Sequence, residues 1–306
     1  MAASMAWPMP GSFRTDMVTP VPLPNVAPSA SMSSAALTVL AALLEARTGQ
    51  QIASHRSTRV DTVLMPLMRE RRLGTLDQLV GAVLDGRDPQ LPGRVIDALL
   101  NGESSFFRDP HVFDHIVERI AEAERGGRRA RIWSVGCSTG QEPLSLAMVF
   151  AERQEQTGTP MPEIVATDIS ETALARARSG CYTQFEVQRG LPIRRMVRWF
   201  DGRGPQEWVA RPELLRHVQF RQHNLVADPA PAGLFDLVLC RNVMLYLAPE
   251  PKTRAFRTIA RAMRPSAGLI LGAGETVIGQ TELFQLAATG RGVYEKCDAE
   301  PASRGL

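Results

Sequence analysis

Apolar residues recur at helical spacing through the N-terminal part of the chain, from Ala35 to about His111. A repeat of three to four residues is typical of helices that bury one face. The stripes are Leu37, Leu40, Ala41 and Leu44; Val60, Val63, Leu64 and Leu67; Leu76, Leu79, Val80, Val83 and Leu84; and Val95, Ile96, Leu99 and Leu100. We therefore predict a small all-helical domain over residues 35–111, followed by a linker helix over 112–129.

After Ala130 the pattern changes to apolar runs of strand length that alternate with helical stretches. Strands separated by helices form parallel sheets with helices on both faces. The predicted strands are 131–135, 163–167, 217–221, 235–240, 268–272 and 292–296, and the predicted helices are 141–156, 170–178 and 249–263. The fold class is therefore α/β, with a Rossmann-like sheet over residues 130–297 and the N-terminal helical domain in front of it.

One interval, residues 181–216, is too long for a simple connection between two such elements. We predict a helix over 192–200 that leads into a small antiparallel β insertion, and a subdomain that spans about 187–216. The aromatic side chains of this interval have two interpretations, a small core of the insertion itself or a surface for a partner. They are Trp199, Phe200 and Trp208.

The first predicted strand of the sheet runs directly into a turn of small residues, from Gly136 to Gly140, and then into a helix. Such a turn brings backbone close to a nucleotide-like ligand at the carboxyl end of the strand. The glycines are spaced G-x-x-x-G, whereas the dinucleotide fingerprint is G-x-G-x-x-G. The turn therefore indicates a nucleoside-like ligand without a pyrophosphate.

Two carboxylates lie near this turn. Asp168 ends the second predicted strand, where an acidic residue commonly accepts hydrogen bonds from ribose hydroxyls; the alternative is a cap of the helix that opens at Ser170. Glu142 lies just past the turn, where it either offsets a cationic ligand or interacts favourably with the helix dipole.

Polar residues also follow the third and fourth strands of the predicted sheet. Asn224 and Leu225 come after the strand 217–221 and either contact an adenine edge or form a polar turn. Arg241 and Asn242 end the buried strand 235–240, and ligands of such sheets bind at carboxyl ends. Tyr246 follows by about one turn, and its alternative is a packed ring.

The junction between the two predicted domains carries the run Gly102 to Pro110, with Phe106, Phe107 and Arg108 together. These aromatic rings and the adjacent guanidinium are suited to closing over a ligand. Packing in a core is the alternative interpretation for the two phenylalanines.

Composition narrows the class of function. The net charge is +3, from 35 basic and 32 acidic residues, which is too mild to indicate nucleic-acid binding. The four cysteines form no CxxC pair and the histidines form no zinc motif, so we expect a reducing cytoplasm and no metal site.

No apolar run reaches membrane-spanning length. Residues 1–34 are rich in Pro, Ser, Ala and Met, which predicts a disordered tail, and 298–306 form a second tail.

Taken together, these residues resemble the CheR-type chemoreceptor methyltransferases from roughly Ala35 to Glu295. The segments that carry the resemblance are Ser-Ser-Phe-Phe-Arg-Asp-Pro, Trp-Ser-Val-Gly-Cys-Ser-Thr-Gly-Gln-Glu-Pro, Ala-Thr-Asp-Ile, His-Asn-Leu and Phe-Asp-Leu-Val-Leu-Cys-Arg-Asn-Val-Met-Leu-Tyr. The resemblance implies transfer of a methyl group from S-adenosylmethionine (SAM) to glutamate side chains of chemoreceptors, which leaves S-adenosylhomocysteine (SAH).

The resemblance also implies roles for individual residues. Arg108 and Tyr246 would flank the reacting carboxylate, and Asp168 would hold the ribose. The residues implied to bind SAM are Ser104, Arg108, Gly136, Glu142, Asp168, Asn224, Leu225, Arg241 and Asn242.

The implied partner is the cytoplasmic helical domain of a chemoreceptor, contacted by a basic helix with Arg56, Arg59, Arg69, Arg71 and Arg72. The chain departs from the family at Gly102, where the family often has Asn, and Ser104 keeps only the hydroxyl of the family's Thr. Met65 and Pro66 interrupt the usual arginine-rich run. The short insertion after Phe200 favours the absence of a tethering peptide.

Other functions remain open on sequence grounds. A nucleic-acid methyltransferase would carry an N-P-P-Y-like motif, whereas Asn242 is followed by Val243 and Met244. The change at Gly102 leaves room for a SAM-binding regulatory module without turnover. A third possibility is a methyltransferase of a receptor array that controls something other than motility.

Overall fold

The computed structural model describes residues 34–52, 60–288 and 292–297. The predicted tails, together with Arg56 and Arg59 of the basic helix, lie outside the described residues. Of the helices described, none combines the length and apolarity needed to cross a membrane.

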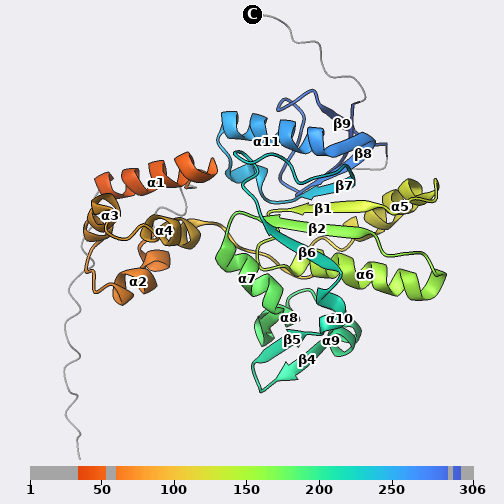
Figure 1. Ribbon diagram of the computed structural model, residues 1–306, viewed down its shortest axis with the longest axis horizontal. Coiled ribbons are helices and arrows are strands. Elements are labelled where there is room, and N and C mark those ends of the chain that lie inside the picture. Colours follow the sequence, from red (N-terminus) through yellow and green to blue (C-terminus); the bar gives the residue numbers. More distant parts are fainter. Residues whose placement is uncertain (1–33, 53–59, 289–291, 298–306) are drawn as a thin grey trace, which may run out of the picture. The chain divides into compact units, whose positions relative to one another are not determined.

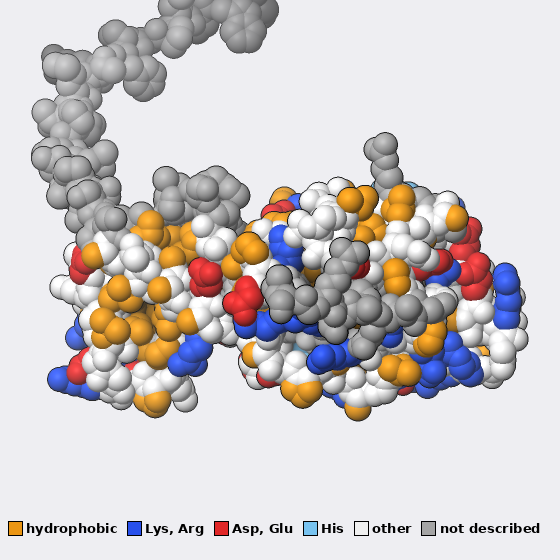
Figure 2. Space-filling view, turned by 90° about the horizontal axis from the view of Figure 1, so that it is seen from above, with side chains coloured by type: hydrophobic (Ala, Val, Ile, Leu, Met, Phe, Trp, Pro, Cys, Tyr) orange, Lys and Arg blue, Asp and Glu red, His pale blue; other side chains and the backbone are white. Residues whose placement is uncertain are grey.

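Short helices make up the N-terminal domain (Figure 1): α1 (Ser34–Thr48), α2 (Val60–Glu70), α3 (Leu76–Asp85) and α4 (Leu91–Leu99). Their stripes meet in one core, with Leu40, Leu64, Leu79 and Val95 fully buried. α1 has no charged residue before Glu45, and hydrophobic side chains gather over the helical domain in Figure 2. The helical periodicity therefore predicted the elements and most of their buried faces, although Val63 and Leu84 of the predicted stripes are exposed.

The larger domain is built on a seven-stranded sheet with the strand order β6-β2-β1-β7-β8-β10-β9. Neighbouring strands are parallel from β6 to β8, and β10 is antiparallel to both β8 and β9. The strands are β1 (Arg131–Val135), β2 (Glu163–Asp168), β6 (Val218–Gln222), β7 (Phe235–Cys240), β8 (Met263–Leu271), β9 (Phe284–Leu286) and β10 (Val293–Lys296). The predicted Rossmann-like α/β fold is confirmed.

Helices cover both faces of this sheet, as Figure 1 shows. One core contains Ile132 and Leu239 together with residues of α5 (Val112–Glu124), α6 (Gln141–Thr157) and α7 (Glu171–Ser179). The opposite core contains Trp133 and Val238 together with residues of α11 (Pro249–Ala262). Successive residues of β1 and β7 thus enter opposite cores, because side chains alternate along a strand.

The insertion forms a three-stranded antiparallel sheet in the order β3-β5-β4. Its elements are β3 (Cys181–Thr183), α8 (Gln184–Gln188), α9 (Ile193–Trp199), β4 (Phe200–Arg203), β5 (Glu207–Ala210) and α10 (Pro212–Leu215). The sheet starts at Cys181, before the expected start near 187, because β3 pairs with β5. Trp199 and Phe200 are buried and Trp208 is half-buried, and all three belong to the core that contains Ile132 and not to a separate core of the insertion.

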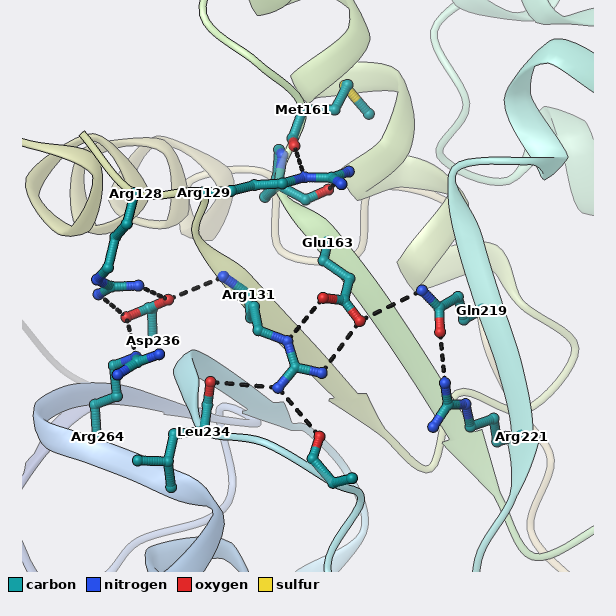
Figure 3. A network of polar contacts seen from close by, with 12 residues as sticks. Arg128, Arg129, Arg131, Met161, Glu163, Gln219, Arg221, Leu234, Asp236 and Arg264 are labelled. Carbon is teal, nitrogen blue, oxygen red and sulfur yellow. Dashed lines mark hydrogen bonds and ion pairs between the residues drawn. The ribbon is translucent and has the colours of Figure 1, made fainter.

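Figure 3 shows an ionic network at the amino-terminal end of the parallel strands. The buried carboxylate of Asp236 accepts hydrogen bonds from the guanidinium of Arg128 and, at 2.9 Å, from the backbone N–H of Arg131. The side chain of Arg131 pairs with Glu163 on the neighbouring strand at 2.8 Å. These contacts stabilise the end of the sheet opposite to the candidate site.

Candidate functional site

The turn after β1 depends on residues without side-chain bulk. Gly136 has φ +65°, and a Cβ atom there would lie 2.5 Å from Cγ2 of Val243. Gly140 caps α6 at φ +92°, and a Cβ atom there would lie 2.8 Å from Cβ of Ala177. Because left-handed backbone and close contacts both favour glycine, the turn can keep its backbone against the neighbouring segments. The hydroxyl of Ser138 donates to the carbonyl of Gly102 at 2.7 Å and ties the turn to the domain junction.

Asp168 ends β2 beside this turn. Its carboxylate accepts the backbone N–H groups of Ser138 at 2.8 Å and Ser170 at 2.9 Å. The cap of α7 is Ser170 itself, whose hydroxyl accepts the N–H of Ala173, so Asp168 is not the helix cap. Burial raises the pKa of the Asp168 carboxyl, and hydrogen bonds from backbone N–H groups, including those of Ser170 and Ser138, only partly counteract this. A ligand that donates hydroxyl groups to this carboxylate would offset the cost of its desolvation.

Arg241, at the end of β7, is a buried guanidinium that joins three segments. It donates to Glu142 at 3.0 Å, to the carboxylate of Asp109, and to the carbonyl of Arg108 at 3.0 Å. Its side chain is 3% exposed, so two carboxylates compensate a charge that is removed from water. Glu142 also accepts the hydroxyl of Ser134 at 2.8 Å. The charge of Glu142 is therefore already partnered within the protein.

Neighbouring residues of the domain junction lie in different surroundings. Phe106 and Phe107 are buried in the core, and Phe106 packs edge-on against Tyr182 with ring centroids 5.0 Å apart. This burial agrees with the core-packing interpretation of the two rings, and neither ring lies among the residues that line the cavity described below. Arg108, the next residue, does line it.

Tyr246 is held by residues of the helical domain. The side-chain amide of Asn101 donates to its hydroxyl. The N–H of Gln51 donates to the carbonyl of Tyr246 at 2.8 Å, and the N–H of Ala248 donates to the carbonyl of Gly49 at 3.0 Å. These two bonds form a short antiparallel β-bridge across the domain boundary, which we call the interdomain bridge. Pattern analysis missed it, because it consists of backbone contacts.

Asn224 has its side chain engaged in a polar turn. Its amide donates to the carbonyl of Arg47 at 2.8 Å, and its side-chain oxygen accepts the N–H of Val226 at 3.1 Å. Leu225 beside it is buried. Burial lowers the pKa of His223, whose Nε2 lies 3.0 Å from the carbonyl of Pro229. The polar-turn interpretation thus accounts for the contacts of Asn224, and its role toward an adenine stays a prediction.

All of the candidate residues line a single cavity of about 620 Å³. They are Ser104, Arg108, Gly136, Glu142, Asp168, Asn224, Leu225, Arg241, Asn242 and Tyr246. The cavity extends from the carboxyl ends of the strands to α2 and α4, where Pro66, Glu70 and Arg94 line it. Small-molecule sites have volumes of roughly 300–1,000 Å³.

The arginines among the described residues of the cavity wall differ in their partners. Arg94 pairs with Glu70, Arg176 with Glu186, and Arg241 with two carboxylates. The guanidinium of Arg108 has no hydrogen-bond or ion-pair partner within residues 34–52, 60–288 and 292–297. Arg108 is therefore the arginine of this wall that is available to an anionic ligand.

Residues 102–293 match the family model described as the SAM-binding domain of CheR methyltransferases. The fold and the matched domain define the class of the protein as a SAM-dependent methyltransferase. More narrowly, the chain belongs to the CheR methyltransferase family.

Named relatives agree with this assignment. Chemotaxis protein methyltransferase 1 of Pseudomonas aeruginosa is 33% identical over 86% of this chain and 98% of its own length. The chemotaxis protein methyltransferase of Vibrio parahaemolyticus is 32% identical over 83% of this chain and 93% of its own. A solved SAM-dependent methyltransferase from Methanosarcina mazei covers 47% of this chain and 51% of its own at 16% identity, with a TM-score of 0.29, which adds no further argument.

The residues of the cavity fit SAM. The carboxylate of Asp168 suits the ribose hydroxyls, and the glycine turn leaves backbone accessible next to it. Two buried nitrogens of the wall, Nε of Arg241 and Nδ1 of His223, have no partner within the part of the chain that the structure describes. Within that same part, no cluster of His, Cys, Asp and Glu side chains is suited to a metal ion.

Proposed function

We propose that this chain transfers a methyl group from SAM to glutamate side-chain carboxylates of methyl-accepting chemoreceptors. The products are glutamyl methyl esters and SAH. The observation that carries this proposal is the guanidinium of Arg108, which has no partner among the described residues, in a cavity whose other described arginines are paired. An arginine fork matches the two oxygens of a carboxylate, so it suits a glutamate substrate.

Methyl transfer to a carboxylate requires the protein mainly to position the two reactants. A glutamate carboxylate is ionised at pH 7 and is already a nucleophile, so no general base is required. Bound SAM supplies a sulfonium methyl group to a carboxylate oxygen, and the electron pair of the broken carbon–sulfur bond stays on sulfur. Arg108 would orient the carboxylate from one side and Tyr246 would bound it from the other. Correct alignment of the reacting atoms is the main contribution to rate in such a site.

The same proposal gives the residues on the other side of the cavity roles in binding SAM. Asp168 would accept the ribose hydroxyls, and Gly136 would let the turn approach the ligand. Glu142 would lie by the methionine part, where its pairing with Arg241 keeps it fixed. The remaining contacts would come from Ser104, Asn224, Leu225 and Asn242.

The proposed partner is the helical cytoplasmic domain of a receptor. Residues of α2 and α4 line the cavity. Arg69 lies in the last turn of α2, and Arg71 and Arg72 follow the helix, where Arg71 already pairs with Asp88. We expect the remaining arginines, Arg69 and Arg72, to contribute to docking. Figure 2 shows Lys and Arg side chains interspersed with Asp and Glu on the face it displays, which does not favour nucleic acid as the partner.

Two further expectations belong to this proposal. Because the antiparallel insertion is short, we expect the chain to bind the receptor without docking a tethering peptide of that receptor. All four cysteines are free thiols, which is typical of a reducing cytoplasm. The receptor domain that carries the methylated glutamates would be exposed to the same compartment.

A labelling experiment tests the proposed function. The purified chain is incubated with methyl-labelled SAM and bacterial membranes that contain chemoreceptors, and the labelled peptides are mapped. We expect base-labile label on receptor glutamates, because carboxyl methyl esters hydrolyse in base. SAM binding without transfer would identify a regulatory module instead. Label on a receptor array unrelated to motility would keep the chemistry and change the pathway.

A further inference from the structure

Glu275 is a buried carboxylate that does not line the cavity. Its Oε2 atom accepts the backbone N–H of Asn242 at 2.7 Å and of Gly272 at 2.8 Å. Its Oε1 atom accepts the backbone N–H of Leu245 at 3.1 Å. One side chain therefore fastens the loop that follows β7 to the end of β8, the neighbouring parallel strand.

The backbone around this carboxylate is shaped to receive it. The N–H of Glu275 donates to the carbonyl of Gly272 at 2.9 Å and closes a tight turn. A Cβ atom on Gly272 would lie 2.9 Å from Oε2 of Glu275 and 3.0 Å from the nitrogen of Asn242. Asn242 itself has φ +59°, a conformation that needs support from its surroundings. Three backbone N–H groups that donate to one side chain provide that support.

The loop held by Glu275 is linked at each end to a residue proposed to contact the substrate. Arg241 precedes it and donates to the carbonyl of Arg108 at 3.0 Å, whereas Tyr246 follows it directly after Leu245. We propose that Glu275 is a positioning residue for methyl transfer, which holds the loop 241–246 so that Arg108 and Tyr246 face the substrate carboxylate. This inference rests on the proposed function for its chemistry and on the three hydrogen bonds to Glu275 for its geometry.

The variant Glu275→Gln tests the inference, because it keeps the size of the side chain but places an amide NH2 against backbone donors. Glu282→Gln is the matched control, since Glu282 is exposed in the same segment between β8 and β9. The measurements are hydrogen exchange of the backbone amides of 242–245, calorimetric binding of SAH, and turnover per SAH-binding site. A second variant, Gly272→Ala, keeps the charge but displaces the carboxylate.

We expect both Glu275→Gln and Gly272→Ala to speed exchange at 242–245 and to lower kcat at least tenfold. The SAH dissociation constant should change less than threefold, with one site per chain. Turnover per binding site within twofold of the unmodified protein would overturn the inference, because a merely structural role would reduce only the number of binding sites. If the unmodified chain labels no receptor, the proposed function fails, and unchanged exchange in Glu275→Gln would still overturn the inference separately.

Discussion

The amide of Asn101, from the segment after α4, donates a hydrogen bond to the hydroxyl of Tyr246, from the loop after β7. The two residues are separated by 145 positions in the sequence and belong to different domains. Asn101 directly precedes Gly102, the position where the family often has Asn. The hydrogen bond indicates that Asn101 supplies an amide to the cavity from the adjacent position.

A double-mutant cycle measures the value of this contact. We expect Asn101→Ala and Tyr246→Phe each to lower turnover about fivefold, which corresponds to about 1 kcal/mol for one hydrogen bond. The double variant should be no slower than the worse single variant, because both changes remove the same bond. Turnover of the double variant equal to the product of the two single effects would show that the residues act independently.

Removal of the guanidinium of Arg108 should lower turnover by more than tenfold while the fold survives. Arg108→Lys keeps the charge but loses the fork, so we expect only partial recovery. Arg87→Ala is the control, since the side chain of Arg87 is 86% exposed and lies outside the cavity wall. Steady-state kinetics with a receptor substrate and circular dichroism check both statements, and normal turnover in Arg108→Ala would remove the basis of the proposed function.

Binding of SAH should weaken as the pH is lowered toward the raised pKa of Asp168. The folded-state pKa lies above that of the unfolded chain, so protonation of this carboxyl stabilises the ligand-free fold as the pH falls. Ligand hydroxyls favour the ionised form, so the ligand must release that proton. Calorimetry over a pH series on the unmodified protein and on Asp168→Asn checks this. The variant should bind SAH more weakly and with little pH dependence, whereas parallel pH curves would assign the effect to another group.

Gly136→Ala should destabilise the protein and weaken SAH binding. The left-handed backbone costs about 1–2 kcal/mol for a residue with a side chain, and the new Cβ would also meet Cγ2 of Val243 at 2.5 Å. The double variant Gly136→Ala/Val243→Ala removes the contact but not the backbone strain, so we expect partial recovery. Urea denaturation gives the free energy of unfolding for each, and full recovery would show that the contact alone matters.

Asp236→Asn should lower the free energy of unfolding by about 2 kcal/mol, because hydrogen bonds from charged groups to the Asp236 carboxylate are lost. Asp236 lies at the amino-terminal end of β7, whereas the cavity lies at the carboxyl ends of the strands, so activity per folded molecule should be unchanged. The exposed pair Asp201–Arg211 provides the control, and Asp201→Asn should change stability by less than about 1 kcal/mol. A loss of SAH affinity in Asp236→Asn would contradict the separation of the two ends.

Much of the fold could be predicted from hydrophobic periodicity. The bounds of β1 and β7 match the predicted ones, because apolar residues predominate in both runs. β8 begins at Met263 instead of residue 268, since α11 leads directly into it and the polar stretch at Arg264 hides the start. β9 was not predicted, because three residues are too few to show an alternating pattern.

The candidate site was predictable where residues follow strand ends, since those ends converge at one edge of a parallel sheet. It was not predictable where function depends on packing or on backbone contacts. From the sequence, Phe106 and Phe107 fit either core packing or a position over the ligand, and the structure places both in the core. Glu275 gave no signal, because it acts through N–H groups of residues 30 and 33 positions away.

The interdomain bridge has a consequence for how relatives of this protein can diversify. The carbonyl of Gly49 accepts the backbone N–H of Ala248, and a Cβ atom on Gly49 would lie 2.6 Å from Cβ of Pro251. The two domains therefore pack too closely at this contact for a side chain at residue 49. A helical domain grafted from another family member would have to restore this fit, because otherwise the segment that carries Tyr246 would lose its backbone partner across the domain boundary.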